Sequence, residues 1–212
     1  MKPADLILGI MQFLEILLPG ALVTFALQPY ALTHLFGPKS PLPRIENETQ
    51  GWVVFFFAAY LLGHIIFLIA SFLDGPAYDR IRRGLKPVKQ DKVYQAATEI
   101  KNRALGPQRR DIINTFQWAK ACLNMSHPSA SSEVKRYESD SKFFRSLVVL
   151  FIVYAIVNVP AGHFAMAAIC LLLAGLCFWR YFDQRWKSTQ VAYIHYIAMG
   201  EAASNAMAVS AE

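Results

Sequence analysis

The chain has 212 residues, of which 55% are hydrophobic, 13% are aromatic and only 17% are charged, with a formal net charge of +6. Soluble domains usually carry about 25% charged residues and lack long apolar runs, whereas this chain has four. The composition therefore excludes an ordinary soluble domain and predicts an all-α membrane protein with four transmembrane helices.

The first two apolar runs lie within residues 1–74, at about 6–27 and 52–73. Each is long enough to cross about 30 Å of hydrocarbon as a helix. The first run is too long for a cleaved signal peptide and is followed by no small-residue cleavage site. We expect residues 1–74 to form a transmembrane hairpin.

Residues 75–142 are polar and basic, and their pattern predicts a helical insertion between the second and third spans. The stretch "GPAYDRIRRG" is expected to continue the second span by about two turns. A short helix should follow, ending at Gly106, and then a second one. The apolar face of this second helix is expected to contain Ile112, Ile113, Phe116, Ala119 and Leu123. The stretch "SSEVKRYESDSKFFRS" contains no helix breaker before the third span.

The second transmembrane hairpin is expected at residues 143–182, with spans at about 143–159 and 162–182 joined by the turn "NVPAG". After the fourth span, residues 183–212 contain no Pro and a single Gly. They are expected to form a C-terminal cytoplasmic helix.

The charge distribution predicts the orientation. Of the 21 Lys and Arg residues, 15 lie between Arg80 and Arg145, while the turn between the last two spans has none. Because basic residues near spans stay on the cytoplasmic side, both termini and the basic insertion are expected in the cytoplasm.

Glu15 is a carboxylate inside the first apolar run. Placing a carboxylate at the centre of a membrane helix costs roughly 2.5–3.5 kcal/mol on insertion scales. In an antiparallel hairpin, His64 would lie at nearly the same depth. One interpretation is a proton- or ion-linked site containing this pair; the other is a buried hydrogen bond, with Tyr60 or Tyr154 as further partners, that fixes helix register.

The basic insertion has residues suited to an anionic ligand or lipid headgroup, with an aromatic ring to stack on a base. The candidates are Arg82, Arg83, Lys86, Lys89, Arg109, Arg110, Trp118 and Tyr94. The simpler interpretation is that these cations contact anionic headgroups and set the topology. The partners expected are membrane lipids and a soluble cytoplasmic protein or nucleotide-type signal, and nothing in the sequence points directly to nucleic acid.

A stripe of small residues in the fourth span would let another helix backbone approach closely. Its members are Ala161, Ala165, Ala168 and Gly175. The stripe could form a homo-oligomer interface or pack against the other spans of the same chain.

Enzyme motifs such as H-E-x-x-H, the P-loop and G-x-S-x-G do not occur in the sequence, so we do not expect an enzyme. Three cysteines without metal-ligand spacing predict neither a disulfide framework nor a metal site. No cofactor is expected.

Two stretches, "LGHIIFLIASFLDGPAYDRIRRG" and "YESDSKFFRSLVVL", resemble segments of small bacterial four-span membrane proteins. Some proteins of this build are effectors or sensors in anti-phage defence. The resemblance implies a protein of the bacterial inner membrane that perturbs or monitors the membrane; it assigns no residue a role. Together with the small-residue stripe and the basic insertion, it leads us to expect an oligomeric effector or sensor that alters membrane permeability on a cytoplasmic signal. The alternatives are a membrane anchor that recruits a soluble partner through the basic insertion, and a small proton- or ion-linked transporter using Glu15.

Overall fold

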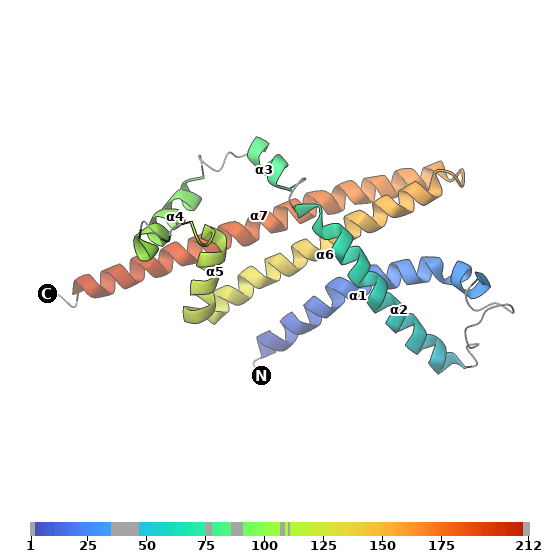
Figure 1. The fold of residues 1–212 in the computed structure, drawn as a ribbon, viewed down its shortest axis with the longest axis horizontal. Coiled ribbons are helices and arrows are strands. Elements are labelled where there is room, and N and C mark those ends of the chain that lie inside the picture. Colours follow the sequence, from blue (N-terminus) through green and yellow to red (C-terminus); the bar gives the residue numbers. More distant parts are fainter. Residues whose placement is uncertain are drawn as a thin grey trace. The chain divides into compact units, whose positions relative to one another are not determined.

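The computed structural model describes residues 3–34, 47–74, 78–85, 91–106, 109 and 111–209. Within these ranges, side chains are described except at 3–8, 11, 12, 29–34, 79, 83, 85 and 203–209. All regular secondary structure in the described residues is helical, which confirms the all-α class (Figure 1). The helices are α1 (Pro3–His34), α2 (Glu48–Ser71), α3 (Asp79–Leu85), α4 (Lys92–Leu105), α5 (Thr115–Ser126), α6 (Pro128–Asn158) and α7 (Phe164–Val209).

The chain divides into two compact units. One contains Met1–Asp74 and Ser139–Tyr181, and we call it the apolar unit. The other contains Gly75–Glu138 and Phe182–Glu212, and we call it the basic unit. The apolar unit has six basic and six acidic residues, whereas the basic unit has 15 and nine. The whole net charge of the chain therefore lies in the basic unit.

Short polar side chains begin three of the helices. Asn47 accepts a hydrogen bond from the Gln50 amide at 2.8 Å, and Asn114 accepts one from Gln117 at 2.8 Å. Asp91 caps α4 in the same way. Such residues satisfy amides that have no partner inside the helix. Gly106 ends α4 with φ of 72°, a conformation that favours glycine, so the predicted end of this helix is confirmed.

One predicted boundary is wrong. Helix α5 begins at Thr115, so Ile112 and Ile113 precede it, and Ile112 is 76% exposed. The cap formed by Asn114 explains this start. Helix α2 ends at Ser71 and α3 begins at Asp79. The predicted continuation of the second span passes through residues 75–77, which lie outside the described residues, so it stays a prediction.

Helices α6 and α7 are 31 and 46 residues long, and each passes from one unit to the other without a break. This confirms that the polar stretch before the third apolar run continues into it, and that the last apolar run extends as a long C-terminal helix. Gly162, with φ of 76°, lies in the turn between them.

Many buried residues of both helices recur at steps of three or four, so they share a helix face. On α6 they include Ser131, Val134, Glu138, Ser141, Arg145 and Val148, and on α7 Ala167, Cys170, Ala174, Tyr181, Gln184, Ser188 and Ala192. Many of these buried residues are small or polar.

Within the part of the chain that the structure describes, two helices are long and apolar enough to cross a membrane: α2 and residues Phe164–Ala202 of α7. A shorter apolar helical stretch, Phe13–Gln28, lies in α1. Two of the four expected spans therefore meet the criteria of length and composition, and the other two stay predictions.

Helices α1 and α2 cross with their backbones in direct contact (Figure 1). A Cβ atom added to Gly20 would overlap the Ala59 carbonyl oxygen, and one added to Gly63 would overlap that of Ile16. Small residues at such a crossing are typical of helix packing in membranes.

Candidate functional site

Glu15 is buried, with 6% of its surface exposed, and its carboxylate accepts a hydrogen bond of 2.5 Å from the Ser139 hydroxyl. Ser139 belongs to the half of α6 within the apolar unit. The charged groups that lie near enough to influence Glu15 are Lys142, Arg145 and Asp140, all on α6. The expected intramembrane carboxylate is therefore held by α6.

Asp74, just after α2, joins two further helices. One carboxylate oxygen forms an ion pair with the Arg145 guanidinium of α6. The other accepts a hydrogen bond of 2.7 Å from the Tyr181 hydroxyl of α7. A single carboxylate thus attaches the end of α2 to both long helices.

Arg145 is the buried cation of this arrangement, with 4% of its surface exposed. Its guanidinium lies 5.0 Å from the centre of the Phe67 ring, and its Nε atom is buried with no hydrogen-bond partner. Burying one guanidinium near two carboxylates balances part of their charge. We call Glu15, Asp74, Ser139, Arg145 and Tyr181 the buried charge cluster, in which the side chain of Asp74 is still 37% exposed. Each of the four long helices provides or adjoins a member.

The residues predicted to accompany Glu15 make other contacts. His64 is exposed and contacts the ring of Tyr60 edge-on, with 4.5 Å between ring centres. Tyr154 of α6 donates a hydrogen bond of 2.9 Å to the backbone oxygen of Leu22 in α1. Within the described residues, the hydrogen bond to the Glu15 carboxylate comes from Ser139.

The order of two contacts gives the direction of α6 relative to α1. Ser139 reaches Glu15, and Tyr154, further along α6, reaches Leu22, further along α1. The two helices therefore run in the same direction, as expected if the first and third spans both pass from the inside outward.

Sequence reasoning missed four members of the cluster: Asp74, Ser139, Arg145 and Tyr181. They lie at the ends of the apolar runs, where a charged or polar residue is not unusual and so does not indicate a site. A signal was nevertheless present in α6, where Ser141 and Arg145 follow the spacing of its buried residues.

Trp118, expected to stack on a ligand, belongs instead to the core of the basic unit. Its indole donates a hydrogen bond of 2.7 Å to the Tyr196 hydroxyl, next to buried Ala97 and Ala119. Cys122 also packs there, and burial raises the pKa of its thiol, so the group stays protonated at neutral pH.

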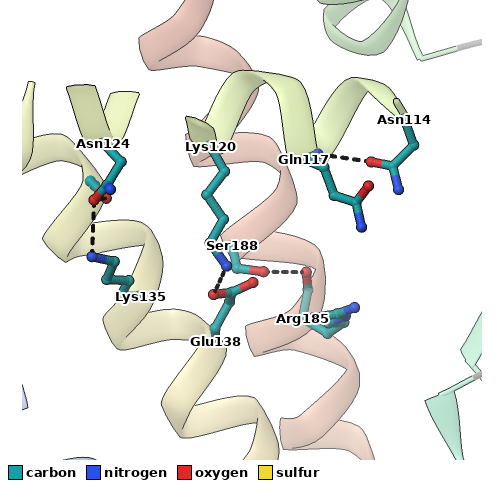
Figure 2. Close-up of polar contacts among 9 residues, drawn as sticks. Asn114, Gln117, Lys120, Asn124, Lys135, Glu138, Arg185 and Ser188 are labelled. Carbon is teal, nitrogen blue, oxygen red and sulfur yellow. Dashed lines mark hydrogen bonds and ion pairs between the residues drawn. The ribbon is translucent and has the colours of Figure 1, made fainter. Parts of the chain in front are cut away.

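Polar contacts connect α5 to α6 within the basic unit (Figure 2). Lys120 forms an ion pair of 2.5 Å with Glu138, and Lys135 donates a hydrogen bond of 3.1 Å to Asn124. A further contact, of 3.1 Å, joins His195 of α7 to Glu133 of α6.

The predicted anionic-ligand residues are only partly described. Side chains of Arg83, Lys86, Lys89 and Arg110 lie outside the described residues, and Arg109 is exposed. Arg82 lies 5.2 Å from the centre of the Trp186 ring. Tyr94 contacts the ring of Tyr193 at 5.8 Å.

The predicted small-residue stripe is on an exposed face of α7 and of the turn before it. Ala161, Ala165, Ala168 and Gly175 are all exposed. The small residues that α7 buries are Ala167, Cys170 and Ala174. Packing inside this chain therefore uses a different face of α7 from the predicted stripe.

The described residues contain no group of three His, Cys, Asp or Glu side chains that could hold a metal ion. Comparison with protein-family models, with curated proteins and with solved structures gives no match to this chain.

Proposed function

We propose that this chain is a multi-pass protein of the bacterial inner membrane that changes membrane permeability when its basic unit receives a cytoplasmic signal. In this proposal α1, α2 and the apolar parts of α6 and α7 are four spans, both termini are cytoplasmic, and the protein acts as an oligomer. A role as an anti-phage effector or sensor follows from the resemblance described above.

The observation that carries the proposal is the inverted polarity of the apolar unit. Large apolar side chains are exposed on all four of its helices, while charged groups are buried. The most exposed include Phe25, Phe57, Leu68, Ile156, Leu172 and Trp179. A hydrocarbon surround accommodates such a surface, and inside it charged groups must find partners in the protein interior.

Buried intramembrane charges commonly belong to ion or proton pathways. The buried charge cluster joins Glu15 to α6, and Asp74 to both α6 and α7. Helices α6 and α7 continue into the basic unit. A conformational change in the basic unit could therefore be transmitted along these two helices to the charges that they hold.

The test is membrane depolarisation, measured with a voltage-sensitive dye in cells producing the protein at matched abundance. The wild-type protein should depolarise the membrane when overproduced, and Arg145→Gln should change that response. Arg103→Gln is the matched control, because Arg103 is exposed and paired only with Glu99 of its own helix.

Wild-type protein that accumulates in the membrane without depolarising it would contradict the proposal. Co-purification of one soluble protein with such inactive protein would instead favour the membrane anchor.

A further inference from the structure

Tyr78, just before α3, and Arg82 of α3 contact aromatic rings and an arginine of α7 within the basic unit. The rings of Tyr78 and Phe182 lie 5.2 Å apart. The Arg185 guanidinium lies 6.0 Å from the centre of the Tyr78 ring, and that of Arg82 lies 5.2 Å from the Trp186 ring. We call Tyr78, Arg82, Arg185 and Trp186 the arginine seam.

Neither arginine of the seam forms an ion pair with any described residue. Asp183, on the same helix, is paired with Lys187 at 2.8 Å. Asp91 caps α4 and accepts a hydrogen bond of 2.7 Å from Gln190. The neighbouring carboxylates whose contacts are described are therefore engaged elsewhere.

Stacking on a ring uses the face of a guanidinium and leaves its N–H groups, which lie in the plane, in need of acceptors. The Nε atom of Arg82 is one such donor, because it is buried and has no hydrogen-bond partner among the described residues. Both arginines are partly exposed, so a ligand from outside can reach them. Phosphate oxygens match the fork of donors that arginine presents.

We propose that Arg82 and Arg185 together bind a phosphate group, supplied by an anionic phospholipid headgroup or by a soluble phosphate compound. The inference rests on the membrane location in the proposed function. Arg185 is four residues beyond Tyr181, the last residue of the apolar unit, or about 6 Å along a helix. That position is close to the level where the headgroups of a membrane would lie.

The test uses the full-length protein in a neutral detergent, titrated with phosphatidylglycerol or with phosphatidylcholine. Native mass spectrometry counts the lipids retained. Wild-type protein should retain phosphatidylglycerol in preference, and the double variant Arg82→Gln/Arg185→Gln should bind it at least about tenfold more weakly, as expected when charged hydrogen bonds are lost. A matched control, Arg103→Gln/Arg136→Gln, removes two exposed charges of the basic unit and should change retention little.

Two further arms identify the source of the phosphate and guard against misfolding. If inorganic phosphate displaces no bound lipid, we conclude that the site binds lipid headgroups. The site binds a soluble phosphate compound if three results hold together. Inorganic phosphate protects the wild-type protein against heat, the double variant loses this protection, and the wild-type protein shows no preference for phosphatidylglycerol. If the double variant fails to fold, the same measurements are made on Arg82→Lys/Arg185→Lys, because this variant keeps both positive charges and loses the fork of N–H donors that arginine presents.

If the seam double variant and the control double variant bind phosphatidylglycerol and inorganic phosphate equally well, the inference is wrong. Binding is measured on purified protein, so its failure and the failure of depolarisation in cells are separate results.

Discussion

Glu15 faces α6 because of its angular position on α1. Ile16 and Gly20, four residues apart, make the contact with α2, whereas Glu15 and Leu22, seven residues apart, are reached by Ser139 and Tyr154. Residues at these spacings share a helix face. One face of α1 thus packs on α2 and the adjacent face on α6.

Glu15→Gln should preserve folding, because the amide oxygen can still accept the hydrogen bond from Ser139. Ser139→Ala should destabilise the protein by about 1–3 kcal/mol, because it leaves a buried carboxylate without its donor. Thermal unfolding in detergent measures both.

The same Glu15→Gln protein, at wild-type abundance and oligomeric state, separates the two interpretations of this carboxylate. Under the proposed function, depolarisation should fall because the charge is lost. Full depolarisation would show that Glu15 serves only as a hydrogen bond that fixes helix register.

The sequence identified Glu15 as unusual but not Ser139 as its partner. The depth of a residue along a span can be read from its position in the apolar run. Which neighbouring helix it faces depends on tertiary packing, here on the contact between Gly20 and Gly63. Depth alone therefore favoured His64, which is exposed on α2.

At the scale of helices, the crossing of α1 and α2 depends on the absence of side chains at Gly20 and Gly63. Gly63→Ala should destabilise the protein by about 1–3 kcal/mol, because the added methyl group forces the backbones apart. Unfolding in detergent, followed by circular dichroism, measures the change.

Gly175→Ala on α7 is the matched control, since a Cβ atom there would meet nothing within 4 Å. It should leave stability unchanged or raise it, because alanine favours a helix over glycine by about 1 kcal/mol. Equal losses from both variants would contradict the prediction, because the loss at Gly63 would then not depend on the close approach of the two backbones.

Helix boundaries were predictable where a local signal sets them and not elsewhere. Gly106 ends α4 as predicted. The start of α5 was misplaced because the apolar spacing continues backward through Ile113 and Ile112, whereas the cap formed by Asn114 decides the first turn. Local hydrogen bonding outweighed the apolar pattern there.

For the molecule as a whole, topology can be tested by cysteine labelling of intact cells, after replacement of the native cysteines. A probe at position 40, which lies outside the described residues, should react with a membrane-impermeant reagent. A probe replacing exposed Ser129 should react only in permeabilised cells. Ser131 is unsuitable because it is buried. Labelling at position 129 in intact cells would place the basic unit outside.

The exposed stripe on α7 predicts the behaviour of an oligomer. Ala165→Leu should weaken association by adding bulk where two backbones approach. Native mass spectrometry measures the subunit number. Ala104→Leu adds the same bulk at an exposed position of α4 and should have no effect. An oligomer unchanged by Ala165→Leu would show that the stripe faces lipid.

The buried charge cluster also imposes an order on biosynthesis. Asp74 precedes its partner Arg145 by 71 residues, and Glu15 precedes Ser139 by 124. At translation rates of about 5–20 residues per second, these intervals last roughly 4–14 s and 6–25 s. The contact between α1 and α2 needs only the first third of the chain, so this hairpin can assemble early. Until α6 has been synthesised, Glu15 and Asp74 therefore lack the α6 partners that they have in the folded protein.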